Sequence, residues 1–336
     1  MKSKIATLFA FVLFIACSKK DNQPATNPPV VTPPVTVTPI IPLPAGWKMA
    51  TPFMTGFPAG IQLFSFDSIF NAQRIKAYCL AYDSRNTLFE FKPVVAASAK
   101  TPSQFFAEEP GLTLACINGG YFSGNQSFSL VKYNNIVSSP NIKSVTRLFN
   151  GNNTAYYPTR GAFGISSTGS PSVSWVYSLG AGNDLIYSYP APSPNALNTA
   201  PQPQPTETFP AGGSIWNTAA AIGGSPVLIK NNNIQITDGE ELIAINNTTS
   251  RPRSAIGYTG NGIILILAVE GDNAPNYPGI NLADLAALLK TLGCNEALNL
   301  DGGGSTSLVV NNSKTVRPGD NGTERAVVSA VLIKRK

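Results

Sequence analysis

The chain is 336 residues long and carries 24 lysines and arginines against 18 aspartates and glutamates, a formal net charge of +6. This mild excess, without a basic stripe interleaved with aromatic residues, does not indicate nucleic-acid binding. The sequence contains no histidine, which excludes a serine triad with a histidine base and argues against a structural zinc centre. Any chemistry must therefore use carboxylates, amides, hydroxyls and the cationic groups of arginine and lysine.

The N-terminus has the pattern of a targeting segment. Lys2 and Lys4 precede an apolar run over residues 5–16, which is too short to span a bilayer comfortably and predicts a signal peptide over residues 1–16. The run ends in Phe-Ile-Ala-Cys17, similar to a bacterial lipobox, which implies lipidation of the Cys17 thiol. The charged residues 18–21 resemble those that send some Bacteroidetes lipoproteins to the outer surface. We therefore expect an outer-membrane-anchored lipoprotein, periplasmic or at the cell surface; an ordinary secretory signal with a chance cysteine is the alternative.

Residues 17–45 are predicted to be the lipidated cysteine and a tether, followed by one domain over residues 46–336. Eight prolines lie within residues 18–45, a composition that favours extended polyproline II and cannot bury a core. The domain contains Cys79, Cys116 and Cys294, whose spacing fits neither a zinc site nor a redox pair. We interpret them as small buried residues, and a Cys79–Cys116 disulfide is the alternative.

Strand patterns dominate the rest of the chain. Short runs rich in β-branched or aromatic residues are separated by Gly, Asn, Asp or Pro, and breaks such as Asn231-Asn232-Asn233 and Asn311-Asn312 are typical of hairpin turns. The predicted strands are, in chain order, residues 74–82, 88–91, 112–117, 162–165, 172–177, 219–222, 227–230, 255–258, 263–269, 297–300, 307–310 and 326–333.

Two helices are predicted among these strands. Thr101-Pro102 opens the first, over residues 101–108. Asn281 is a good N-cap for the second, over residues 282–292, where leucine and alanine repeat at helical spacing. We therefore expect an α+β fold, a large mixed or antiparallel sheet system with a few covering helices. Residues 190–210 carry seven prolines and are predicted to be a long surface loop near the functional site, with a domain boundary as the alternative.

Four polar clusters lie at the ends of predicted strands and begin at Asn118, Arg253, Glu270 and Asp301. The last of them reads Asp-Gly-Gly-Gly-Ser-Thr, and its glycines allow close approach of the backbone to a ligand. Taken alone, this motif is also typical of a hairpin turn. Because binding and catalytic groups favour such positions, we expect the four clusters to converge at one rim of a sheet.

These residues resemble the phosphodiester glycosidase family. The order and spacing agree over residues 112–333, and the most specific part is the helix over 282–292 followed by residues 297–305. The other matching pieces are residues 118–122, Gly223-Gly224-Ser225-Pro226, residues 253–257, Glu270-Gly271 and Glu324-Arg325. The family often has a histidine where this chain has Arg251, which leaves altered chemistry or none as alternatives.

The resemblance implies a hydrolase that cleaves the sugar C1–O bond of sugar-1-phosphodiesters, such as those of N-acetylglucosamine, in surface or extracellular glycans. The departing phosphate monoester needs little protonation, so one carboxylate acting with hydrogen-bond donors to the phosphate could suffice. Two alternatives stay open, a non-catalytic glycan-binding surface lipoprotein and a phosphodiesterase that attacks phosphorus.

As a hypothesis we assign Asp301 as base, nucleophile or oxocarbenium stabiliser, Glu270 as a second catalytic carboxylate, and Arg253 as the clamp on the phosphate. Tyr121 is expected to stack on the sugar ring. For Arg325, a structural partnership with Asp301 or Glu324 is the alternative to substrate binding. The full substrate-binding set comprises Asn118, Gly119, Tyr121, the N–H groups of Gly302, Gly303 and Gly304, the hydroxyls of Ser305 and Thr306, and Arg325.

No cofactor is expected. Asp301, Asn118 and Asp272 offer oxygen ligands, so a bound Ca²⁺ or Mg²⁺ is an alternative. The expected partners are a phosphorylated glycan or sugar-1-phosphodiester and, through the lipid on Cys17, a membrane.

Overall fold

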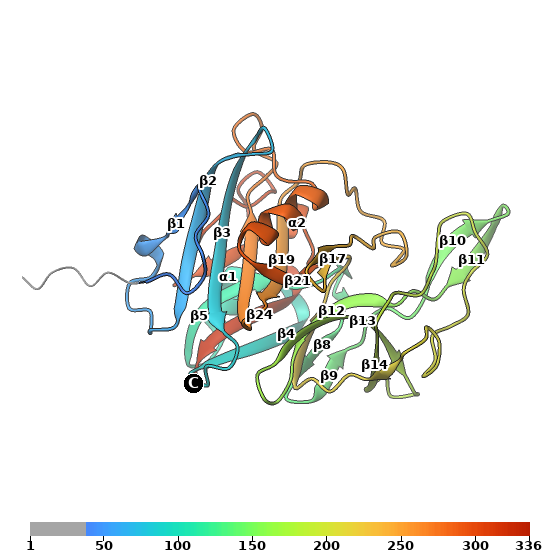
Figure 1. Cartoon of the computed structure of the whole chain (residues 1–336). Coiled ribbons are helices and arrows are strands. Elements are labelled where there is room, and N and C mark those ends of the chain that lie inside the picture. Colours follow the sequence, from blue (N-terminus) through green and yellow to red (C-terminus); the bar gives the residue numbers. More distant parts are fainter. Residues whose placement is uncertain (1–37) are drawn as a thin grey trace, which may run out of the picture. The chain divides into compact units, whose positions relative to one another are not determined.

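The computed structural model describes residues 38–336, and the predicted signal peptide, Cys17 and most of the predicted tether lie outside the described residues. The described strands form an eight-stranded, a seven-stranded and a five-stranded sheet and two small hairpins (Figure 1). Every strand pairing within residues 38–336 is antiparallel. Of the two sheet types left open by the sequence, the structure therefore has the antiparallel one.

The eight-stranded sheet is buried on both faces. In its strand β20 (Ile263–Val269), Ile264, Ile266 and Ala268 face one core and Leu265, Leu267 and Val269 face another, as the two-residue period of a strand requires. The unbroken apolar run of β20 thus follows from burial on both sides. The strand order is β1 (Trp47–Met49), β2 (Ile61–Phe70), β3 (Gln73–Asp83), β20, β19 (Arg253–Thr259), β21 (Cys294–Asn299), β17 (Val227–Lys230) and β18 (Asn233–Ile234).

The other two sheets close the molecule around the inner face of the first. Leu80 of β3, Trp175 and Ile117 belong to one buried cluster to which all three sheets contribute. The seven-stranded sheet runs β15 (Ser214–Ile215), β14 (Leu185–Tyr189), β13 (Pro171–Leu179), β12 (Arg160–Ile165), β16 (Ala220–Gly223), β8 (Val131–Tyr133) and β9 (Ile136–Ser139). The five-stranded sheet runs β23 (Ser313–Lys314), β22 (Leu308–Val310), β5 (Leu112–Asn118), β24 (Val327–Arg335) and β4 (Phe89–Lys100).

Two α-helices occur within residues 38–336, and both match the predictions. Helix α2 (Leu282–Thr291) covers the outer face of the eight-stranded sheet, and the Asn281 side chain caps it by accepting a hydrogen bond from the Asp284 N–H at 2.8 Å. Helix α1 (Pro102–Glu108) begins with a capping box between Thr101 and Gln104 and packs on the five-stranded sheet. Neither described helix is long and apolar enough to cross a membrane. Two short 3₁₀ turns, Thr51–Phe53 and Gly303–Ser305, complete the helical elements.

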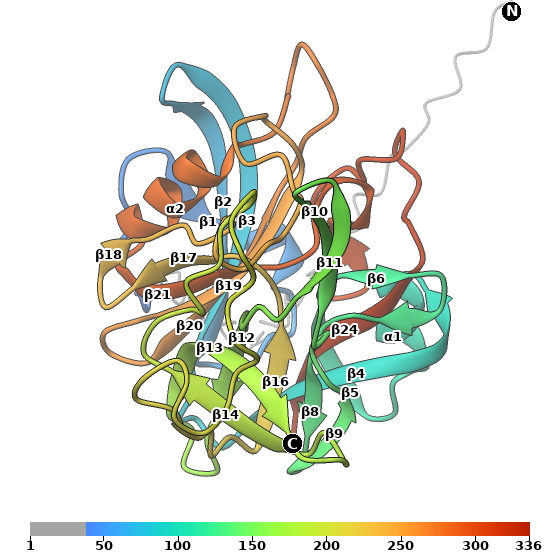
Figure 2. The same ribbon diagram turned by 90° about the vertical axis from the view of Figure 1, so that its right-hand side faces the viewer.

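Paired asparagines close several hairpins. Asn231-Asn232 joins β17 to β18 and Asn311-Asn312 joins β22 to β23, and all four residues have positive φ. Two-residue hairpin loops of this kind match the right-handed twist of the strands, and asparagine tolerates the conformation better than most residues. The predicted hairpin turns are confirmed. The two isolated hairpins are β6 (Phe122–Ser123) with β7 (Gln126–Ser127), and β10 (Val145–Phe149) with β11 (Asn152–Tyr156), which projects from the body at the right of Figure 1 and toward the viewer in Figure 2.

Three expectations need correction, and one alternative is excluded. Strands so outnumber helices in the described residues that the α+β label fits only loosely, and the fold is a sheet-rich single unit over residues 39–336. Ile41 is 3 % exposed, so the last residues of the predicted tether pack against the domain. The three described cysteines are free and buried, so no Cys79–Cys116 disulfide forms. The loop over residues 190–210 connects β14 to β15 and contributes no residue to the pocket described below.

Candidate active site

Strand ends from two sheets meet at one rim of the molecule. Arg253 at the start of β19 pairs with Val269 at the end of β20, and Ala255 pairs with Asn299 at the end of β21. The Asp301 N–H then donates to the Gly119 carbonyl at 3.1 Å, which joins this edge to the end of β5 in the five-stranded sheet. The four polar clusters singled out in the sequence therefore come together in space.

A pocket of about 450 Å³ opens at this rim. Of the predicted site residues, the pocket wall includes Tyr121, Arg253, Asp301, the three glycines and Arg325, while Asn118, Gly119, Glu270, Ser305 and Thr306 are not part of it. The complete wall consists of Tyr121, Ile245, Asn246, Arg251, Arg253, Asp272, Asp301, Gly302, Gly303, Gly304, Asp320 and Arg325.

Asp301 carries a carboxyl group whose pKa is raised to about 6. Burial is the main cause, because removing a carboxylate from water disfavours its charged form. Three groups act in the opposite direction: the Ser305 hydroxyl, the Gly302 N–H, which donates to Asp301 Oδ1 at 2.9 Å, and the more distant charge of Arg325. A carboxyl group with a pKa near neutrality in a pocket is suited to proton transfer.

Three guanidinium groups share the pocket with this carboxyl group. Arg253 is 5 % exposed, and two of its nitrogens donate to the carbonyls of Ile280, Asn246 and Thr249. Its Nη1 has no partner among the described residues, so the planar group is held rigidly with one nitrogen left for a ligand. Burial lowers the pKa of Arg253, yet a guanidinium stays charged in proteins.

The other two guanidinium groups are paired with carboxylates that the sequence analysis did not assign as catalytic. Arg325 forms two hydrogen bonds of 2.8 Å to Asp320. Its carboxylate partner is therefore Asp320, and neither Asp301 nor Glu324. Arg251 lies 3.5 Å from Asp272 and is more than half exposed. The residue in the place of the family histidine therefore lies in the pocket as a loosely held cation.

Tyr121 is fixed by its hydroxyl group. The hydroxyl donates to the Ser225 carbonyl at 2.7 Å and accepts from Asn299 Nδ2 at 2.9 Å. Burial, followed by the charge of Asp301, raises the pKa of Tyr121. The ring therefore lies in the wall of the pocket in one orientation.

Two of the three glycine N–H groups that were predicted to cradle the phosphate are occupied within the chain. The Gly303 N–H donates to the Pro252 carbonyl at 2.8 Å and the Gly302 N–H donates to the Asp301 carboxylate, so neither is available to a ligand. Gly303 has φ +58°, and a Cβ at Gly304 would lie 2.1 Å from Asp320 Oδ1. The glycines are needed for this tight conformation and for the close approach of the Asp320–Arg325 pair.

Asn118 and Gly119 support the backbone of Asp301 from outside the pocket. Asn118 is fully buried; its amide nitrogen donates to the Asp301 carbonyl at 2.8 Å, and its oxygen accepts from the Ser254 hydroxyl at 2.6 Å. A Cβ at Gly119 would lie 2.3 Å from Ser329 Oγ. These two residues thus position Asp301 and do not contact the pocket, contrary to the prediction that they bind substrate.

Glu270 has its carboxylate turned into the protein. It is 2 % exposed, and its oxygens accept from Lys76 Nζ at 3.0 Å, from the Arg317 N–H at 3.0 Å and from Asn273 Nδ2 at 3.2 Å. With both oxygens occupied and outside the pocket wall, Glu270 anchors the loop after β20. The strand-end pattern located the residue but could not tell which way its side chain points.

Ser305 and Thr306 are each 1 % exposed, and neither hydroxyl forms a hydrogen bond of standard geometry among the described residues. The Ser305 hydroxyl nevertheless lies close enough to Asp301 to lower the pKa of that carboxyl group. These hydroxyls lie beneath the pocket floor and do not line it.

The sequence analysis missed Glu241, which accepts hydrogen bonds from the Gly-Gly-Ser-Pro motif and the residue after it. This fully buried carboxylate accepts hydrogen bonds from the Gly161 and Val227 N–H groups at 2.8 Å, from Thr237 Oγ1 at 2.6 Å, from Trp175 Nε1 at 3.1 Å and from the Ser225 hydroxyl. Burial raises its pKa. The sequence analysis also missed Asp320 and Asn246, because both occur in polar segments that are typical of turns.

The described residues 38–336 contain no group of three or more His, Cys, Asp or Glu side chains arranged to hold a metal ion. The Asn118 oxygen accepts from Ser254 and Ser307, so it does not join Asp272 and Asp301 as a ligand.

Comparisons with known proteins agree with this architecture. The described fold is similar to a hypothetical protein from Synechocystis, with TM-score 0.55 and 17 % identity over 82 % of this chain and 62 % of that one. It is also similar to the zebrafish N-acetylglucosamine-1-phosphodiester α-N-acetylglucosaminidase catalytic domain auto-inhibited by its pro-peptide, with TM-score 0.55 and 16 % identity over 82 % of this chain and 83 % of that one.

A curated relative is the uncharacterized SPbeta prophage-derived protein YomE of Bacillus subtilis, 38 % identical over 82 residues. The matched region spans 24 % of this chain and 12 % of YomE, and the chain covers less than two thirds of the Synechocystis protein.

The fold and the site define a sheet-rich protein with the partly buried Asp301 carboxyl group beside three arginines, two of them paired with other aspartates, at a shared rim. The sequence profile of the phosphodiester glycosidases matches residues 113–334. This chain belongs to the phosphodiester glycosidase family.

Proposed function

We propose that the protein hydrolyses sugar-1-phosphodiesters, similar to those of N-acetylglucosamine, at the sugar C1–O bond in surface or extracellular glycans. Membership of the phosphodiester glycosidase family supports the reaction class. The observation that carries the proposal is the Asp301 carboxyl group, with its pKa of about 6, in a pocket that also presents Arg251, Arg253 and Arg325. A phosphodiester brings one negative charge, which the guanidinium groups attract.

The ionised Asp301 carboxylate accepts a proton from water that attacks C1, or attacks C1 itself to form a glycosyl ester that water then hydrolyses, which restores the carboxylate. The C1–O bond breaks, and its electron pair leaves on the phosphate monoester, which needs no proton at neutral pH. The free nitrogen of Arg253 faces the departing phosphate, and preorganised donors of this kind stabilise charge that develops in the transition state. Tyr121 supports the sugar ring. Glu270 takes no part, because its oxygens are occupied.

Two measurements test the bond that breaks and the residue responsible. In water labelled with heavy oxygen, label in the sugar hydroxyl supports attack at C1, and label in the phosphate would show attack at phosphorus. An aryl-phosphate ester of N-acetylglucosamine serves as substrate, with Asp301→Asn as the matched variant. We expect turnover by the natural chain and a loss of at least about a hundredfold in the variant.

The position of Arg251 favours a second candidate, a non-catalytic glycan-binding protein. This guanidinium lies in the pocket where family members often have histidine, so an imidazole acid or base is missing there. If the natural chain and Asp301→Asn are equally inert while a phosphorylated glycan still binds, this second candidate replaces the first.

We further propose that the protein works at the outer membrane, anchored through a lipid on Cys17. The lipobox-like residues before Cys17 support this. Incorporation of labelled palmitate into the natural chain but not into Cys17→Ala is the expected result, and equal labelling of both would contradict it.

A further inference from the structure

A second pocket of about 400 Å³ lies at the end of the eight-stranded sheet opposite the candidate active site. Arg253 and Val269 mark the active-site end of β19 and β20, whereas the second pocket lies beyond the start of β20, where the Ser84 N–H donates to the Gly262 carbonyl at 3.2 Å. The seven residues of β20 separate the two places by about 20 Å. None of the described residues lines both pockets.

Aromatic side chains from three sheets give this pocket fixed walls. Tyr82 of β3 and Phe89 of β4 are buried and meet edge to face, with ring centroids 5.8 Å apart. Phe91 packs on the shared core, and Tyr133 of β8 closes another side. Rings held by the core do not need to be ordered when a ligand binds, which lowers the entropy cost of binding.

Two buried hydroxyls beside the pocket lack partners. Tyr82 is 2 % exposed, and neither its hydroxyl nor that of Ser84 forms a hydrogen bond among the described residues. Both residues line the pocket. Buried polar groups in folded proteins are nearly always satisfied, so these two unpaired hydroxyls mark this side of the pocket as a place where a water or a ligand can bond.

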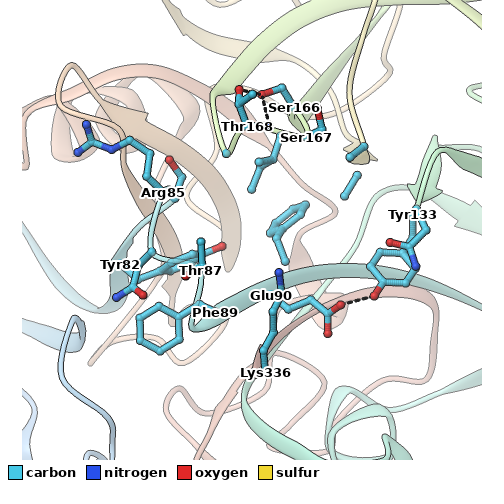
Figure 3. A pocket seen from close by; sticks show the side chains of 18 residues that line it. Tyr82, Arg85, Thr87, Phe89, Glu90, Tyr133, Ser166, Ser167, Thr168 and Lys336 are labelled. Carbon is cyan, nitrogen blue, oxygen red and sulfur yellow. Dashed lines mark hydrogen bonds between the residues drawn. The ribbon is translucent and has the colours of Figure 1, made fainter.

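The remaining polar groups face each other across the pocket. Glu90 receives a hydrogen bond from the Tyr133 hydroxyl on its Oε1 atom, and its Oε2 has no partner among the described residues. The Ser166 and Thr168 hydroxyls, 2.9 Å apart, lie on the opposite side, and Lys336 lies next to Glu90 (Figure 3). The pocket therefore offers acceptors and donors on facing sides.

The charge of the pocket favours a neutral ligand. The Arg85 guanidinium donates to the Asp83 carboxylate at 2.9 Å and to the Asn261 carbonyl at 3.1 Å, so its positive charge is paired within the chain. Glu90 contributes one negative charge to the lining of the pocket and Lys336 one positive charge. Aromatic walls, a carboxylate oxygen and several hydroxyls suit a ring that is apolar on its faces and carries hydroxyls at its edge.

We propose that this pocket binds one neutral sugar residue of a glycan, at a site separate from the candidate active site. Glu90 accepts hydrogen bonds from two of its hydroxyls, the Tyr82 and Ser84 hydroxyls bond to others, and Tyr133 borders the ring. The proposal does not depend on hydrolysis, because a chain without catalytic activity would keep this pocket.

The test uses the full chain and saturation-transfer NMR with the methyl glycosides of glucose, galactose, mannose and N-acetylglucosamine. We expect at least one glycoside to bind, and Glu90→Gln and Tyr82→Phe each to weaken its binding about tenfold. Tyr78→Phe, a tyrosine of the same strand outside the pocket, is the matched control and keeps binding. Asp301→Asn also keeps it, which separates this site from the active-site pocket.

Thermal unfolding of the same variants distinguishes a binding role from a structural one. The Tyr82 hydroxyl has no partner in the described chain, so Tyr82→Phe is expected to unfold at the same or a higher temperature while its binding is weaker. Two results overturn the proposal: none of the four glycosides binds, or binding is unchanged in both Tyr82→Phe and Glu90→Gln.

Discussion

Asp301 is the residue on which the chemistry of the candidate site depends. Its carboxyl group is held by one N–H and lies near a hydroxyl, and burial outweighs both influences on its pKa. As a base or nucleophile it must be ionised. We predict that kcat/KM for a sugar-1-phosphodiester rises about tenfold per pH unit below pH 6 and levels off above it. A rate profile from pH 4 to 9 checks this, and activity that falls as the pH rises through 6 would assign Asp301 as an acid.

The raised pKa also predicts that Asp301 lowers stability at neutral pH. The pKa is about 6 in the folded protein and 3.8 for the unperturbed group, so the folded state binds the proton more tightly. The stabilising contribution is present below pH 4 and is lost as the pH rises through 6. Asp301→Asn is therefore expected to raise the free energy of unfolding by about 3 kcal/mol at pH 8 and to have little effect at pH 4. Urea unfolding at both pH values checks this; equal effects would exclude the charge as the cause.

Arg251 is exposed enough for salt to screen it. Its guanidinium is loosely paired with Asp272 and faces the pocket. We predict that Arg251→Ala raises KM for the phosphodiester about threefold to tenfold at low ionic strength, with a smaller effect in 0.5 M salt (about a 4 Å Debye length). Arg74→Ala, which removes another exposed, carboxylate-paired arginine outside the pocket, is the control. An equal effect from both variants would argue against a role in substrate binding.

At this scale the sequence located the site better than it assigned roles within it. Asp301, Arg253 and Tyr121 could be found because glycine-rich strand ends mark places where chains approach closely. The roles of Asn118 and Glu270 could not be predicted, because a polar side chain at a strand end can turn inward as easily as outward. The tertiary packing decides which direction it takes. The role of Arg325 could not be predicted either, because its partner is Asp320. The two side chains meet only through a tertiary contact next to Gly304.

Among the elements, the loop over residues 236–252 is attached to the sheets by Glu241. Five donors from β12, β13, β17 and the adjoining turns converge on its carboxylate. We predict that Glu241→Ala lowers the free energy of unfolding by about 3–5 kcal/mol, because it leaves buried N–H groups without partners. Chemical denaturation measures this. Glu240→Ala, whose side chain has no hydrogen bond among the described contacts, is the control and should cost less than about 0.5 kcal/mol.

The strands that the sequence predicted are those with a buried face. β17 and β20 match their predicted bounds, since an apolar run is visible without any knowledge of partners. The hairpin of β10 and β11 was missed because most of its residues remain accessible and no apolar alternation marks it. β2 was missed for a different reason: Gln62, Ser65, Asp67 and Ser68 interrupt its apolar residues along the whole strand.

For the molecule as a whole, the central sheet should be the most stable part. β20 is buried on both faces and paired on both edges, whereas the β10–β11 hairpin pairs only with itself. We predict that amide hydrogens of β20 exchange only through global unfolding and that those of β10 and β11 exchange faster by a factor of at least about a thousand. Hydrogen-exchange mass spectrometry measures this, and equal protection of the two segments would contradict it.

The five-stranded sheet has a consequence for biosynthesis. β4 and β5 are translated early, yet β4 pairs only with β24, and β5 pairs with β22 and β24, roughly two hundred residues further along. Until residue 335 has emerged, each of these strands keeps an edge with unpaired backbone N–H and C=O groups. Such edges can pair with strands of other chains. Such distant pairings also slow folding. The nascent polypeptide therefore needs shielding, by a chaperone or a translocation channel, until its final strand is released.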